Sequence, residues 1–140
     1  MTDRFEISLT FRHPSLDPSE VSGTFGLTPT FAFRSGSHVG PVIHKSGVWH
    51  GVLAKGAGSE EYEEALKKSV SLLESRQEWL NGAFRSEGEF EVIFAYWTDL
   101  DEGKICQTDF YPELLVRLSK LNAGMRVEVW KDEEEMRASD

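Results

Sequence analysis

Hydrophobic and polar residues alternate over residues 5–11, close to the start of the chain. The apolar positions are odd-numbered and the polar ones even-numbered: Phe5, Ile7, Leu9 and Phe11 against Glu6, Ser8 and Thr10. Successive side chains of a strand point to opposite faces, so this period predicts a strand with one buried and one wetter face. Residues 89–98 form a second β-rich run whose faces are both apolar, which indicates a central strand.

Residues 18–25 carry the start and stop signals of a short helix. Asp17 can accept a hydrogen bond from a free N–H group of the first turn, and Pro18 suits the first helical position. Glu20 stands where a capping box needs an acid. Gly26 favours a left-handed stop, so the helix is expected to end there.

Two further helices and several shorter strands follow. The longest helix is expected over 59–80, with Ser59 as its cap and an apolar stripe that suits a helix lying on a sheet. A third helix begins at Pro112 and closes at Gly124. The remaining expectations are strands over 31–34, 48–53 and 125–130, loops over 35–41 and 54–58, a turn over 99–103 and a hairpin strand over 104–110.

This order of elements predicts one α+β domain over residues 1–140, with residues 131–140 as a frayed charged tail. The sheet is expected to be mixed or antiparallel, with the helices packed on one face. Two segments share one plan, in which a strand leads through a Pro-initiated helix and a Gly to another strand. They are residues 5–33 and 105–130, and we interpret them as two β-α-β units for which a ferredoxin-like arrangement is one candidate.

The same motifs resemble a known family. They are Leu-Asp-Pro-Ser-Glu-Val at 16–21, Gly-Leu-Thr-Pro-Thr at 26–30, Gly-Val-Trp at 47–49, the long amphipathic helix, and the segments 110–115 and 121–125. In these features the chain resembles the uncharacterised, mainly bacterial domain of unknown function 4279 family, over about residues 5–130. Trp130 stands where the family pattern has Tyr. The resemblance implies a fold and a family, and it brings no activity, substrate or site residue.

Composition and charge narrow the choice of partner. The formal net charge is −9, which disfavours nucleic acid and anionic membrane surfaces and leaves a basic protein as the partner that charge would attract. The single cysteine, Cys106, cannot form an internal disulfide and favours a reducing compartment. No signal-peptide pattern or apolar run of about 20 residues is present, so we expect a cytoplasmic protein.

The candidate chemistry is concentrated in one loop–strand region. It contains the residues of the predicted binding site, which are Arg34, His38, His44, Trp49 and His50. Their spacing matches no zinc motif, and no nucleophile–base signature or phosphate loop occurs in the sequence. We therefore predict no catalytic residue, no metal ligand and no cofactor.

Three functions remain open at this point. The residues favour a non-enzymatic protein-interaction or regulatory protein, of which one version is an immunity-type protein that neutralises a basic partner. The alternative is a small-molecule binder or an unusual enzyme, with its site around the five residues of the predicted binding site. A third interpretation is a homodimer that forms through an unpaired sheet edge.

Overall fold

The computed structural model describes residues 4–39, 41–43, 45–83, 88–98 and 110–131. In chain order its elements are β1 (Arg4–His13), α1 (Pro18–Phe25), β2 (Phe31–Phe33), β3 (His38–Val39), β4 (Val42–Ile43), β5 (Gly47–Ala57), α2 (Ser59–Glu74), α3 (Gln77–Ala83), β6 (Glu89–Thr98), α4 (Pro112–Lys120) and β7 (Gly124–Lys131).

Five of the described strands form one sheet in the order β2-β5-β1-β6-β7, while β3 and β4 pair with each other. Neighbours in the large sheet are antiparallel, except that β6 and β7 run parallel. The prediction of an α+β fold with a mixed sheet is therefore confirmed.

The first four strands of the large sheet have a ferredoxin-like arrangement. β1 and β2 are parallel with β5 between them, and β5 and β6 are parallel with β1 between them. The first predicted unit corresponds to β1-α1-β2. The second unit is β5-α2-α3-β6 rather than the predicted segment 105–130, because β7 follows α4 and extends the sheet beside β6.

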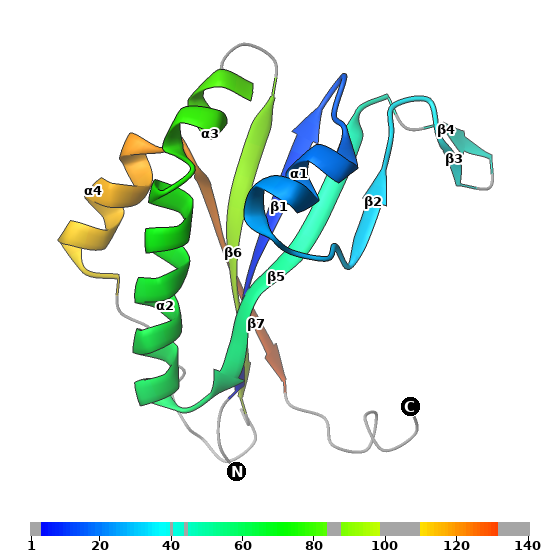
Figure 1. Cartoon of the computed structure of the whole chain (residues 1–140). Helices are drawn as coiled ribbons and strands as arrows, with labels where there is room; N and C mark the ends of the chain where they lie inside the picture. Colours follow the sequence, from blue (N-terminus) through cyan, green and yellow to red (C-terminus); the bar gives the residue numbers. More distant parts are fainter. Residues whose placement is uncertain (1–3, 40, 44, 84–87, 99–109, 132–140) are drawn as a thin grey trace.

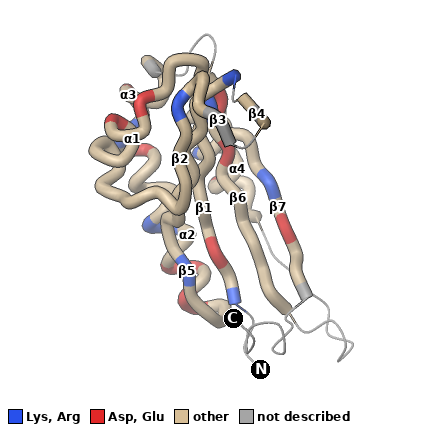
Figure 2. The backbone as a smooth tube through the Cα atoms, turned by 90° about the vertical axis from the view of Figure 1, so that its right-hand side faces the viewer, with Lys and Arg blue, Asp and Glu red and all other residues tan. Residues whose placement is uncertain are grey.

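β1 lies at the centre of the sheet and supplies the core with the side chains that the alternation predicted to be buried. They are all at most 5 % exposed: Phe5, Ile7, Leu9 and Phe11. Figures 1 and 2 show the helices on this side of the sheet. The Phe11 ring contacts four rings from other elements, those of Phe25, Trp49, Trp79 and Phe90. These contacts join sheet and helices into one core.

The predicted ends of α1 are confirmed. The Asp17 carboxylate accepts a hydrogen bond from the Ser19 N–H at 3.0 Å, and Gly26 ends the helix with φ 65°. Glu20 does not complete a capping box as predicted. Its carboxylate instead accepts a hydrogen bond from the Trp79 indole at 3.1 Å, which ties α1 to α3.

The long helix predicted over 59–80 is interrupted between α2 and α3. At the break, Arg76 donates from Nε to the carbonyl of Thr24 at 2.7 Å, near the end of α1. A basic side chain that satisfies a late helix carbonyl stabilises that helix end, and this contact holds the chain at the break. The N-cap of α2 is Gly58 rather than the predicted Ser59.

β5 is longer than the strand predicted over 48–53, and it includes most of the loop predicted over 54–58. It continues to Ala57 because the first half of β1 pairs with it there. Inside this strand, the backbone at Gly51 approaches a buried ring closely. A Cβ at this position would lie 2.4 Å from the Trp49 ring.

Several predictions concern other parts of the chain. The loop predicted over 35–41 contains β3, which pairs with β4 just beyond it. The turn at 99–103, residues 104–109 with Cys106, and the tail from 132 lie outside the described residues. Within the described residues, no helix is both long and apolar enough to cross a membrane.

Candidate functional site

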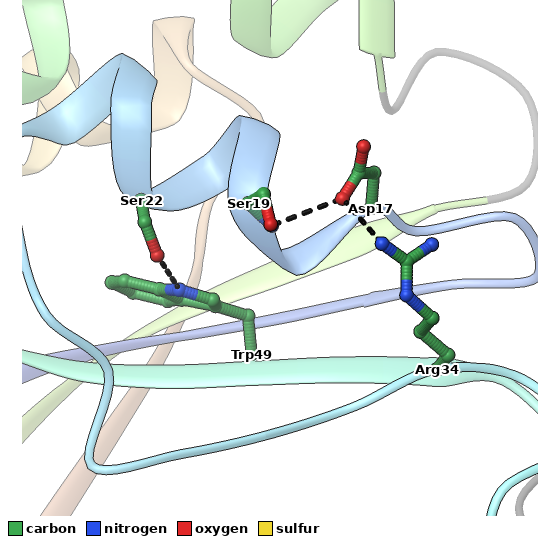
Figure 3. Close-up of polar contacts among 5 residues, drawn as sticks. All are labelled: Asp17, Ser19, Ser22, Arg34 and Trp49. Carbon is green, nitrogen blue, oxygen red and sulfur yellow. Dashed lines mark hydrogen bonds and ion pairs between the residues drawn. The ribbon is translucent and has the colours of Figure 1, made fainter.

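Trp49, one of the five predicted site residues, belongs to the core. It has no exposed surface, and its indole N–H donates to the Ser22 hydroxyl of α1 at 3.0 Å. Figure 3 shows the indole directed at α1. A side chain held in this way packs sheet against helix, and a ligand in solvent cannot reach it.

Arg34, a second predicted site residue, supports the start of α1. Its guanidinium lies 3.0 Å from the Asp17 carboxylate, the group that also caps the helix through the Ser19 N–H. Figure 3 shows Asp17 between these two donors. The ion pair is largely exposed, and such pairs contribute about 0–1 kcal/mol to stability.

Of the three histidines in the predicted site, two lie within the described residues and one lies outside them. His38 is placed in β3 by its backbone, and His44 lies outside the described residues. His50 is well described in β5. Because it follows Trp49 directly in a strand, its side chain points to the opposite side of the sheet. The predicted cluster is therefore divided between the two sides of the sheet.

His50 lies on the side of the sheet that faces away from the helices, which we call the open face. Its Nδ1 is hydrogen-bonded to the Thr10 hydroxyl at 2.8 Å, and its ring stacks on Phe31 with centroids 5.0 Å apart. Partial burial lowers the pKa of His50 below its ordinary value, while the charges of Glu6 and Glu128 act in the opposite direction. The imidazole is thus fixed in position and favoured in its neutral form.

Two carboxylates flank a small residue on the open face. Ala95 of β6 pairs with Glu6 of β1 on one side and with Glu128 of β7 on the other. Neighbouring strands are about 4.8 Å apart, so the two glutamate backbones are about 10 Å apart across a single methyl group. The registers place His50 on the same side of the sheet, since it pairs with Thr10, which lies four residues after Glu6 in β1.

The other glutamates of the open face have cationic partners. Arg12 lies 3.8 Å from Glu89, and Arg126 lies 3.2 Å from Glu91. In the described part of the chain, Glu6 and Glu128 make no ion pair. We call these two carboxylates the acidic pair, since they are the negative charges of this face that a ligand could neutralise.

Two tryptophans lie at one end of the acidic pair. Trp97 and Trp130 are directly paired across β6 and β7, one residue pair beyond Tyr96 and Val129. Trp130 is 51 % exposed and Trp97 is half-buried, so both offer aromatic surface to solvent. The Arg4 guanidinium lies 5.1 Å from the centre of the Trp97 ring, so this surface already accepts one cation.

The open face carries a hydrogen-bonded Thr10–His50 pair beside its charged and aromatic side chains. The Thr10–His50 pair has the separation of a nucleophile and its base. However, Thr10 is only 6 % exposed, so a reacting carbon cannot approach its hydroxyl. Among the described residues, no group of three or more His, Cys, Asp or Glu side chains could hold a metal ion. The groups that this face presents to a ligand include charged side chains, aromatic surface and a fixed imidazole.

Sequence reasoning missed the acidic pair. The alternation over 5–11 already placed Glu6 on the wetter face of its strand. It could not place Glu128 beside it, since the pairing of β7 with β6 joins segments that are distant in sequence.

Comparison with known proteins agrees with the resemblance noted above. No curated protein and no solved structure matches the chain significantly. One family model, described as Domain of unknown function (DUF4279), matches residues 3–132 and so covers nearly the whole chain. The chain therefore belongs to the DUF4279 family.

Proposed function

We propose that this domain is a non-enzymatic protein-interaction module whose open face binds a basic segment of a partner protein. The observation that carries the proposal is the acidic pair, Glu6 and Glu128, which flanks Ala95 on the open face and makes no ion pair within the described part of the chain. A lysine or arginine of the partner would bind between the two carboxylates.

The surroundings of the acidic pair support a cationic ligand. Trp97 and Trp130 offer aromatic faces, on which Lys and Arg side chains bind through cation–π contacts. The net charge of −9 would steer a basic protein toward the domain and raise its association rate. An immunity-type protein that neutralises a basic protein is one form of this function.

The geometry favours this face over the small-molecule site around the five predicted residues. Trp49 is enclosed in the core, Arg34 is engaged with Asp17, and His50 faces the other side of the sheet. The open face instead combines His50 with groups that the earlier hypothesis did not include.

A binding measurement with a defined probe tests the proposal. The probe is a synthetic peptide rich in Arg and Lys, titrated into the full chain and followed by tryptophan fluorescence and backbone NMR shifts. We expect shifts at β1, β6 and β7. Because each exposed ion pair contributes about 0.2–1 kcal/mol, the double variant Glu6→Gln/Glu128→Gln should bind about two- to thirtyfold more weakly.

A matched variant separates this site from general charge attraction. Glu63→Gln/Glu78→Gln removes the same number of charges from exposed helix positions on the other side of the sheet. It should bind the peptide almost as well as the wild type. Equal losses in the two double variants, or equal binding of an acidic peptide, would contradict the proposal.

A further inference from the structure

One edge of the sheet is only partly occupied. β5 has eleven residues and pairs with β1 at every position except Leu53, where the register shifts. On its outer side, β2 pairs only with Val48, Trp49 and His50. In the part of the chain that the structure describes, residues 51–57 of β5 therefore have no strand on that side. An unpaired edge presents N–H and C=O groups that can pair with another chain.

The N–H groups of this edge can be assigned a direction. The Ala57 N–H donates to the Glu61 carboxylate of α2 at 2.9 Å, so it points away from β1. Opposed residues of antiparallel strands alternate between hydrogen-bonded and non-hydrogen-bonded pairs. Ala57–Arg4 is thus a non-hydrogen-bonded pair, and so is Lys55–Glu6 two residues earlier. The N–H and C=O of Lys55 consequently point to the open edge.

The hydrogen bond between the Ala57 N–H and Glu61 resembles one that an added strand would form with this edge. The Glu61 oxygen takes the position of a strand carbonyl and satisfies one outward N–H group. Gly56 permits this approach, since a Cβ there would lie 2.4 Å from the same oxygen and 3.1 Å from the Phe5 ring. Beyond Glu61, the outward groups of Lys55 have no such protein partner within the described residues.

A groove of about 550 Å³ runs between this part of β5 and α2. In Figure 1, α2 leaves the lower end of β5 and runs back alongside it. The floor is apolar and is formed by Phe5, Leu53, Ala54, Ala65 and Leu72. The rim is charged and is formed by Lys55, Glu60, Glu61, Glu64 and Lys68. Lys68 lies 3.6 Å from Glu64, which leaves Glu60 as a rim carboxylate at the start of the groove.

We infer that this groove binds an extended segment of a partner polypeptide, which adds to β5 as a further strand. In this mode of recognition, main-chain hydrogen bonds supply affinity and pockets for alternate side chains supply specificity. The Lys55 N–H and C=O would form the main-chain bonds. Every second side chain of the segment would be small and apolar, to fit the floor, and a basic residue would lie at Glu60.

This inference is independent of the open face. The floor of the groove lies on the helix side of the sheet and shares no residue with the acidic pair, although Lys55 of the rim is the cross-strand neighbour of Glu6. The failure of one proposal therefore leaves the other intact, and the residues that respond to a bound peptide distinguish them.

The test begins with random peptides displayed on phage and selected against the full chain. We expect the selection to enrich peptides with alternating small apolar residues and at least one basic residue. One enriched peptide is then synthesised and titrated into the isotope-labelled protein. Bound peptide should slow hydrogen exchange at the Lys55 amide and shift the resonances of α2 residues that line the groove.

Two substitutions at one position isolate the main-chain contact. Lys55→Pro removes an N–H that points outward, so the pairing with β1 is kept, and proline is tolerated at such edge positions. Lys55→Ala removes the same charge and keeps the N–H. Since one hydrogen bond is lost, Lys55→Pro should weaken binding about three- to tenfold, against less than about twofold for Lys55→Ala.

Several results would overturn the inference. The first is a selection that enriches no peptide. The second is a peptide that binds Lys55→Pro and Lys55→Ala with equal affinity while circular dichroism shows both variants folded. The third is a set of NMR shifts confined to the open face. Light scattering that shows a dimer which Lys55→Pro dissociates would also overturn it, because the occupant of the edge would then be a second copy of this chain.

Discussion

Trp49 and His50 are neighbours in β5, yet one is sealed in the core and the other lies on the open face of the sheet. Trp49 has no exposed surface and bonds to α1, whereas His50 bonds to Thr10 on the far side. The strand alternation directs one side chain into the packed core and the next to the face that we propose as a binding surface. Each role can therefore be tested without disturbing the other.

The packing role is tested at Gly51. An added Cβ would lie 2.4 Å from the buried Trp49 ring, which has no room to move. Overpacking of a filled core costs about 1–3 kcal/mol, so Gly51→Ala should lower the free energy of unfolding by that amount. Urea denaturation followed by tryptophan fluorescence measures the change.

Gly23→Ala in α1 is the matched control, because a Cβ there meets no atom within 4 Å. Replacing a helical glycine with alanine reduces the entropy of the unfolded chain, and this variant should gain about 0.4–1 kcal/mol. Opposite signs for the two variants are the expected result. A neutral Gly51→Ala would show that the ring is not held against the backbone.

A second prediction concerns the contact between α2 and α4. Arg117 donates from Nε to the Glu74 carboxylate at 3.0 Å, and a second nitrogen bonds the other oxygen. This hydrogen bonding lowers the pKa of Glu74 and raises the pKa of Arg117. Both side chains are about one-third exposed, so solvent screening limits the effect, and Glu74→Gln should cost about 0.5–1 kcal/mol.

The pH dependence identifies the source of that loss. A carboxyl group with a lowered pKa stabilises the fold above its ordinary pKa and loses this contribution as the pH falls through the lowered value. The difference between wild type and Glu74→Gln in urea denaturation should therefore vanish in acid. Glu64→Gln, which removes the exposed pair with Lys68, should cost less at neutral pH. A difference that persists in acid would point to packing rather than charge.

Features that depend on a single segment of the chain could be predicted from the sequence. The buried face of β1 follows from alternation, and the ends of α1 follow from Asp17 and Gly26. The division of Trp49 from His50 also follows from the expected strand. Trp49 and His50 were assigned to one predicted site because they are adjacent in sequence, although adjacent side chains in a strand point to opposite faces.

The acidic pair and the open edge of β5 could not be predicted in this way. Glu6 and Glu128 are separated by most of the chain, and only the register of β1, β6 and β7 places them on either side of Ala95. Part of the β5 edge is open because β2 pairs with only three residues of β5. Register between distant strands is set by packing of the whole sheet, and periodicity within one segment does not report it.

The last prediction tests His50. Partial burial lowers its pKa, so the folded protein binds this proton at a lower pH than the unfolded chain does. Stability therefore rises with pH between the lowered pKa and about 6.5, the ordinary value for histidine. Urea denaturation across this range should show wild type losing stability on acidification, and His50→Gln should lack that component.

NMR titration of the imidazole links the same group to the acidic pair. Glu6 and Glu128 act to raise the pKa of His50, so Glu6→Gln/Glu128→Gln should move its titration to still lower pH. A cationic peptide bound between the carboxylates should shift it in the same direction, because it neutralises the two charges and adds a positive one nearby. A pKa at or above the ordinary value in the free wild type would contradict the assigned burial. An unchanged pKa in the double variant would mean that the acidic pair lies outside the electrostatic reach of His50.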